Sequence, residues 1–198
     1  ISATDVKKLR DMTGAGMMDA KKALTETNSD FEAAVKYLRE KGLADSKKRE
    51  DKEANQGTIG DYIHYQQDRA VSGVLVELAC ETDFVAKSEE FKESAKQIAM
   101  HIAAMKPNYL NIEDIPEAKI TEEKDIIVKQ SENEGKPTEV IEKIVEGRII
   151  SFYKDTVLNE QIFCNPEIYD GKVSTMIEEM SGKLGAKIFI KQFSRVEV

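Results

Sequence analysis

The chain has few of the residues that active-site chemistry usually needs. Its 198 residues include two cysteines, two histidines and no tryptophan. Cys80 and Cys164 lie far apart and form no CxxC pair, and with only His64 and His101 beside them they do not provide the ligand spacing of a zinc site. This sparse use of cysteine is typical of a reducing compartment.

Long apolar runs and nucleotide or catalytic motifs are also missing. No segment approaches the roughly 20 apolar residues of a membrane span, and no basic segment followed by an apolar one opens the chain. The first residue is Ile1 rather than methionine, which leaves a processed or trimmed N-terminus open. The chain has no GxxxxGKS, GxxxxGKT, HExxH or GxSxG motif, and Gly14 and Gly16 form a GxG without a third glycine. We therefore expect no enzyme, no cofactor, no metal and no membrane contact.

The charge balance bears on the class of partner. The chain has 37 acidic and 29 basic residues and a net charge of −8, so it has no bulk positive field to hold a phosphate backbone. Nucleic acid is not expected as a direct partner. Hydrophobic residues make up 40% of the chain, which is enough for a core, and the length suits one domain or a small domain joined to a larger one.

The first 44 residues predict a small three-helix domain. The second helix is expected at about Met18 to Thr27, and the third begins at a capping box of Ser29 and Glu32 and ends at Gly42. Residues 45–56 contain the charged stretch DSKKREDKEA without an apolar period, which indicates a solvated linker or helix extension. Residues 57–198 then form the second domain.

The second domain alternates strand and helix patterns. Two strands are expected at Thr58–Tyr65 and Val71–Cys80 around a turn at Gln66–Arg69, and a helix beginning near Ser88 is stopped by Pro107. A helical hairpin is expected at residues 122–134 and 137–155. A last helix begins at about residue 173, and a closing strand spans residues 186–198. The predicted fold class is α+β, with a three-stranded antiparallel sheet and a helical hairpin.

The segment ETDFVAK, Glu81 to Lys87, follows the second strand directly and has two interpretations. In the first, Phe84 turns inward against the core while Thr82 or Asp83 caps the next helix. In the second, the segment is a loop that presents Phe84 and the carboxylate of Asp83 to a partner, because aromatic anchors dominate interface energetics. His101 lies about 60° from the apolar stripe of the following helix, and a histidine at such a boundary is usually a packing residue. Cys80, at the end of the second strand, is predicted to be a small core residue.

Four stretches of the chain resemble the elongation factor Ts family, the guanine nucleotide exchange factors of elongation factor Tu. They are LRDMTGAGMMDAKKAL (residues 9–24), ELACETDFVAK (77–87), MHIAAMKP (100–107) and KPTEVIEKIVEGRI (136–149). The resemblance implies a ubiquitin-associated-like N-terminal module that binds the partner's nucleotide-binding domain, followed by an α+β core.

The resemblance also implies which residues bind the partner. By position, Asp83 and Phe84 match family residues that push between two helices of the partner's GTPase domain, and His101 matches the family histidine that joins them. Ala79 stands where the family usually has asparagine. The full set of implied partner-binding residues is Thr82, Asp83, Phe84, Val85, His101, Leu9, Arg10, Thr13, Gly14, Ala15, Gly16, Met17 and Met18.

The chain resembles the short form of the family, which implies a homodimer whose two subunits can each supply contacts to one partner. It implies binding to elongation factor Tu in its GDP-bound and nucleotide-free states, in the cytoplasm or, after removal of a targeting peptide, inside an organelle. Two other hypotheses stay open at this point. One is a protein-binding adaptor without exchange activity, and the other is an enzyme that uses His64, His101 and nearby carboxylates.

Overall fold

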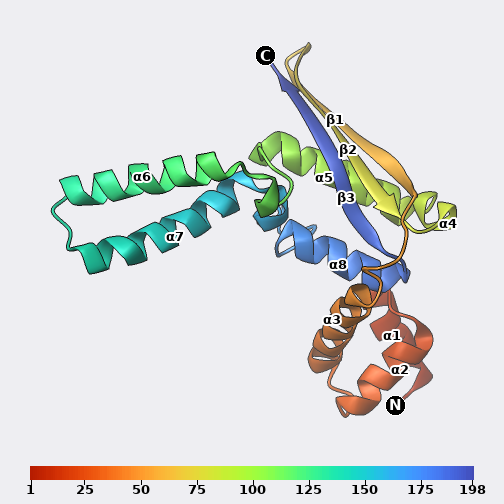
Figure 1. Cartoon of the computed structure of the whole chain (residues 1–198). Helices are drawn as coiled ribbons and strands as arrows, with labels where there is room; N and C mark the ends of the chain where they lie inside the picture. Colours follow the sequence, from red (N-terminus) through yellow and green to blue (C-terminus); the bar gives the residue numbers. More distant parts are fainter. The chain divides into compact units, whose positions relative to one another are not determined.

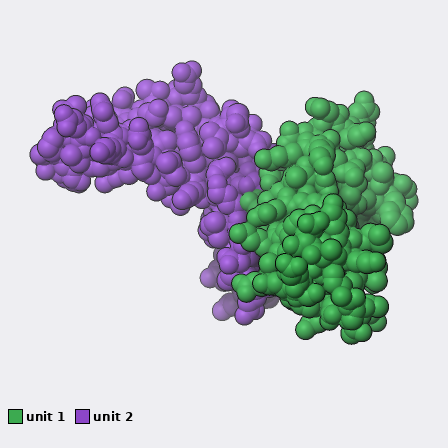
Figure 2. Space-filling model, turned by 90° about the horizontal axis from the view of Figure 1, so that it is seen from below, with its two compact units in different colours: residues 1–58, 78–92, 175–191 green, residues 59–77, 93–174, 192–198 purple.

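The computed structural model describes residues 1–198, which divide into two compact units (Figure 2). Unit 1 comprises residues 1–58, 78–92 and 175–191, and unit 2 comprises residues 59–77, 93–174 and 192–198. The division runs through the strands and through two helices. None of the helices combines the length and the apolar character that crossing a membrane requires.

Three short helices open the chain, as predicted. They are α1 (Ala3–Thr13), α2 (Met17–Glu26) and α3 (Phe31–Lys47) (Figure 1). Ser2 caps α1 by accepting a hydrogen bond from the backbone N–H of Asp5, which in turn bonds back through its carboxylate. The helices pack around a small core made of Val6, Leu9, Ala20, Ala23, Leu24 and Ala34.

The predicted limits of the third helix are wrong at both ends. Ser29 has a left-handed backbone (φ 66°), and the cap is Asp30, whose carboxylate accepts a hydrogen bond from the Ala33 N–H at 3.0 Å. The helix also continues past Gly42 to Lys47. Gly42 therefore lies inside the helix, where its missing side chain leaves room for a close approach by Gly182.

The three strands are β1 (Gln56–Gln66), β2 (Arg69–Cys80) and β3 (Ile188–Glu197), and they form one antiparallel sheet in the order β1-β2-β3. The hairpin turn between the first two strands consists of Gln67 and Asp68, as predicted, and Gln67 has a positive φ of 57°. With the helices, this sheet confirms the α+β class.

The remaining helices are a one-turn helix α4 (Asp83–Ala86), α5 (Glu89–Met105), α6 (Glu117–Asn133), α7 (Thr138–Thr156) and α8 (Val173–Leu184), with short 3₁₀ turns at Ile112–Asp114 and Leu158–Glu160. Within unit 2, α6 and α7 lie side by side as the predicted helical hairpin (Figure 1). Their connection turns at Gly135, which has a φ of 71°. Helix α6 starts at Glu117, directly after Pro116 and five residues earlier than expected.

Candidate functional site

Residues 81–88, called here the aromatic turn, form a closely bonded segment at the end of β2. Thr82 is the N-cap of α4, and its hydroxyl accepts a hydrogen bond from the Val85 N–H at 3.3 Å. The buried thiol of Cys80 donates to the Thr82 carbonyl at 3.2 Å. At the other end, the Ser88 hydroxyl donates to the Val85 carbonyl at 2.8 Å. The backbone of the turn is therefore held on both sides of Phe84.

Glu81 anchors the base of the aromatic turn. Its carboxylate accepts a hydrogen bond from the backbone N–H of Lys187 at 2.6 Å, and the Arg49 guanidinium lies 3.7 Å from the same oxygen. Val85 is buried. One side of the turn therefore faces the interior of unit 1, which leaves Phe84 on the other side.

The side chain of Phe84 points outward and is 83% exposed. The inward interpretation is therefore wrong for Phe84. Thr82 does cap a helix, but that helix is the one-turn α4, which the sequence analysis did not predict. Beside the ring, the Asp83 carboxylate pairs with the Lys87 ammonium at 2.7 Å, one helical turn later. The hydrogen bond from Lys87 and its positive charge lower the pKa of Asp83, so this carboxylate stays ionised at neutral pH.

Residues 12–18, called here the methionine loop, form the second group of implied partner-binding residues. Gly14 ends α1 in a left-handed conformation (φ 68°), and its N–H donates to the Arg10 carbonyl at 2.7 Å. The half-buried Thr13 donates through its hydroxyl to the Leu9 carbonyl at 2.8 Å and accepts from the Ala15 N–H at 3.3 Å. The loop between α1 and α2 is thus a defined turn.

The exposed side chains of the methionine loop are apolar and adaptable. Met17 and Met18 are exposed, Met18 by 76%, and so is Met12, which the sequence analysis did not select. Three methionines within seven residues were the available signal, since methionine is over-used at binding surfaces. Leu9 is fully buried in the three-helix core, so it supports the loop from beneath. Thr13 and Ala15 are half-buried, and Arg10, Gly14 and Gly16 are exposed.

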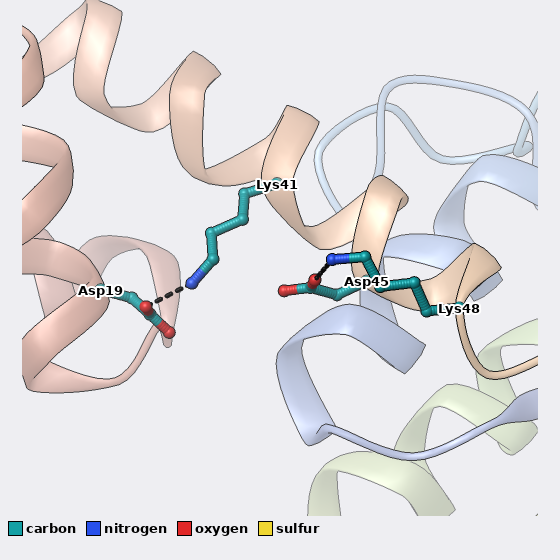
Figure 3. A network of polar contacts seen from close by, with 4 residues as sticks. All are labelled: Asp19, Lys41, Asp45 and Lys48. Atoms are coloured by element: carbon teal, nitrogen blue, oxygen red, sulfur yellow. Dashed lines mark hydrogen bonds and ion pairs between the residues drawn. The ribbon is translucent and has the colours of Figure 1, made fainter.

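One ion pair, Asp19–Lys41, holds the start of α2 against α3 (Figure 3). Asp19, in the first turn of α2, accepts a hydrogen bond from the Lys41 ammonium, which raises the pKa of Lys41. On α3 itself, the Lys48 ammonium bonds to Asp45 at 3.0 Å and lowers the pKa of Asp45. The Asp19–Lys41 pair therefore joins the residues that follow Met18 to the third helix.

His101 is a packing residue, as its place at the edge of the apolar stripe predicted, and it is fully buried within unit 2. Its Nδ1 accepts a hydrogen bond from the Cys164 N–H at 3.0 Å, its Nε2 bonds to Gln161 Oε1 at 2.9 Å, and its ring stacks on Phe163. Burial lowers the pKa of His101, only partly offset by the bond to Gln161, so the ring is neutral. The exposed histidine is His64, whose Nδ1 lies 3.3 Å from the Tyr62 hydroxyl.

Unit 1 brings the aromatic turn and the methionine loop into one compact body, and His101 belongs to the other unit. The exposed groups are an aromatic ring, thioethers and an ionised carboxylate. Side chains of these kinds make apolar contacts and charge pairs. The described residues contain no group of three or more histidine, cysteine or acidic side chains placed to hold a metal ion.

Comparison with known proteins gives one consistent family. The family model "Elongation factor TS" matches residues 3–198. Among curated proteins, elongation factor Ts of Moorella thermoacetica is 49% identical over 198 residues, covering all of this chain and 95% of the relative. The Herpetosiphon aurantiacus and Fervidobacterium nodosum proteins of the same name are each 46% identical, covering all of this chain and 98% of the relative. On this agreement along its whole length, the chain belongs to the elongation factor Ts family of translation elongation factors.

Proposed function

We propose that this protein binds the GTPase elongation factor Tu, in its GDP-bound and nucleotide-free states, and promotes release of GDP. The supporting observation is Phe84, an 83% exposed ring on a turn whose backbone is bonded on both sides. A side chain on a backbone that is already fixed loses less conformational entropy when a partner buries it. Such residues act as anchors at interfaces.

The mechanism needs no contact with the nucleotide. A GTPase holds GDP through a phosphate loop and a magnesium ion that requires near-ideal octahedral coordination, so small displacements of the surrounding helices weaken binding sharply. In the proposal, Phe84 and Asp83 insert between two helices of the GTPase domain and displace them. The methionine loop holds the same domain at a second place.

The energy required explains why more than one contact takes part. A thousandfold increase in the release rate requires about 4 kcal/mol off the barrier. Burial of Phe84 supplies about 1.5–3 kcal/mol by apolar transfer, so the remainder must come from other contacts. Binding is also reciprocal: if this protein weakens the affinity for GDP, GDP weakens the affinity for this protein by the same factor, and excess nucleotide displaces it.

The proposal assigns separate roles along the chain. Residues 1–44 form a ubiquitin-associated-like partner-binding domain, residues 45–56 a linker and residues 57–198 the core. The contact of His101 with the partner remains a prediction, and it would require the ring to leave its buried cluster. His64 is the histidine that a partner could reach without such a change. The activity would operate where translation takes place, in a bacterial cytoplasm or an organelle.

We also propose that the core forms a homodimer through the outer face of the β1–β2 hairpin. An added Cβ on Gly60 would clash with Ala95 of α5, so that face is covered, whereas Ile63 lies over Gly73 on the opposite face. Alternation along the strands places three other exposed apolar side chains on the face of Ile63: Ile59, Tyr65 and Leu75. Such a patch suits a second copy of the chain rather than nucleic acid. Sedimentation should show a dimer that Leu75→Asp dissociates.

Release of labelled GDP from elongation factor Tu tests the proposed exchange activity. We expect the wild-type protein to accelerate release and Phe84→Ala to slow the stimulated release at least tenfold. Ile150→Ala is a matched control, because Ile150 on α7 is 53% exposed and lies far from the aromatic turn in sequence. Binding of the wild-type protein without accelerated release would favour the adaptor hypothesis, and an unchanged rate for Phe84→Ala would reject the role of Phe84.

A further inference from the structure

The side chain of Lys183, on α8, contacts the methionine loop and the start of α5, the helix that follows the aromatic turn, all within unit 1. Its stem lies directly over Gly14 of the methionine loop, where an added Cβ would come within 1.9 Å of Lys183 Cε. Its ammonium bonds to Glu90 Oε1 at 2.6 Å. The absence of a side chain at Gly14 therefore provides the space that Lys183 occupies.

Glu90 is continuous with the aromatic turn. It is the second residue of α5, and Ser88, which bonds to Val85 of the turn, also accepts a hydrogen bond from the Phe91 N–H at 3.4 Å. The start of α5 and the turn that carries Phe84 are therefore one bonded segment. Lys183 joins this segment to the methionine loop.

Neighbouring residues of α8 contact the three-helix region in the same way. Glu179 pairs with Arg39 of α3, and Gly182 lies against Gly42. Positions 179, 182 and 183 share one face of a helix because they are three and four residues apart. This face of α8 lies against the three-helix region, and Lys183 also bonds to Glu90, in the segment that continues from the aromatic turn.

We propose that Lys183 is a positioning residue that fixes the separation between the methionine loop and the aromatic turn. The part of this inference that concerns binding of the partner rests on the proposed function. Two contacts held at a fixed separation engage one surface at high effective concentration, because binding of the first makes binding of the second intramolecular. If the methionine loop moved independently of Phe84, part of that effective concentration would be lost.

The alternative is an ordinary surface ion pair. Exposed pairs often contribute little to stability, and on that view removal of Lys183 leaves the loop and the turn where they are. The two views differ in the distance between the loop and the turn rather than in stability. The decisive measurement is therefore a distance distribution in the protein without its partner.

Spin labels at Met18→Cys and Phe84→Cys in the full chain provide this distance. Cys164→Ser removes the exposed thiol, and Cys80 is buried. We expect a single narrow distribution with Lys183 present, at least a twofold broader one in Lys183→Ala, and recovery in Lys183→Arg, which keeps the charge and a long stem. Lys172→Ala is the matched control, because it removes the 2.6 Å pair with Glu160 in unit 2. An unchanged width in Lys183→Ala would overturn the proposal.

The release assay, with Phe84 and Met18 intact, measures the consequence for function. We expect Lys183→Ala to raise the concentration that gives half-maximal GDP release about threefold to tenfold, while the maximal rate stays within twofold. Equal half-maximal concentrations for the two proteins would reject the role of Lys183 in binding. If the wild-type protein releases no GDP, the proposed function fails, and the distance distributions still decide whether Lys183 fixes the separation.

Discussion

A Cβ built on Gly182 would lie 2.4 Å from the carbonyl oxygen of Gly42, so α8 and α3 approach backbone to backbone at this pair. Any side chain at Gly182 meets main-chain atoms, which cannot rotate away as the end of a side chain can. Both glycines lie inside helices, where glycine is unfavourable relative to alanine. The close crossing of the two helices explains the choice of glycine there.

Gly182→Ala should destabilise unit 1 despite the higher helix propensity of alanine. The added methyl group forces the two helices apart, and overpacking of this kind costs about 1–3 kcal/mol. Gly147→Ala is the control, because nothing lies within 4 Å of a Cβ on Gly147 in α7. Urea unfolding should show a lower free energy for Gly182→Ala and an equal or higher one for Gly147→Ala. Equal stabilities for Gly182→Ala and the wild type would contradict the close crossing.

Two phenylalanines near the end of β2 should respond oppositely to truncation. Phe84→Ala should leave the melting temperature nearly unchanged, because the ring is already in solvent. Phe91→Ala should cost about 3–5 kcal/mol, because Phe91 is fully buried and its removal leaves a cavity. Thermal unfolding followed by circular dichroism compares the two variants. A loss of several kcal/mol in Phe84→Ala would instead place this ring in the core.

The buried cluster around His101 should make stability depend on pH. The pKa of His101 is lowered in the folded protein, so at mildly acidic pH the unfolded chain binds a proton that the folded chain does not. The contribution of His101 to the free energy of unfolding is therefore complete above the ordinary histidine pKa of 6.5. It is lost as the pH falls from there through the folded pKa. The groups that face the ring carry no charge: they are the Gln161 amide, the Phe163 ring and the backbone N–H of Cys164.

His101→Gln tests this dependence. The variant should lose stability at neutral pH, because it removes the ring that stacks on Phe163, and its stability should vary less between pH 7 and pH 5 than that of the wild type. Denaturant unfolding at several pH values gives both quantities. Identical pH dependence in the two proteins would show that His101 titrates in the folded state as it does in the unfolded chain.

The ion pair beside Phe84 makes a prediction about the ionisation of Asp83. Lys87 lowers the pKa of Asp83, so Lys87→Met should return this pKa toward the reference value of 3.8. Titration followed by NMR of the Asp83 side chain measures the change directly. Both side chains are largely exposed, so the fold should not change. If the pKa of Asp83 is the same in both proteins, Lys87 does not pair with it in solution.

Local patterns were sufficient for much of the fold. The spacing of apolar residues predicted three N-terminal helices, the helical hairpin and the strand pair around residues 67 and 68, because such periods depend on positions a few residues apart. Thr82 was considered as a helix cap, since a cap needs only a side-chain oxygen and an N–H three residues later, but the one-turn helix α4 that it caps was not predicted. The family signatures in residues 9–24 and 77–87 also pointed to the two candidate surfaces.

Features that depend on distant segments required the tertiary structure. Gly42 looked like a helix end because its neighbour, Gly182, is 140 positions later in the chain. His101 looked like a boundary residue because Gln161 and Cys164, which bury and bond it, come 60 and 63 residues later. The direction of Phe84 was open in the sequence, and the packing of Val85 with unit 1 decided it. Periodicity records which face of an element is apolar, but only the fold determines what covers that face.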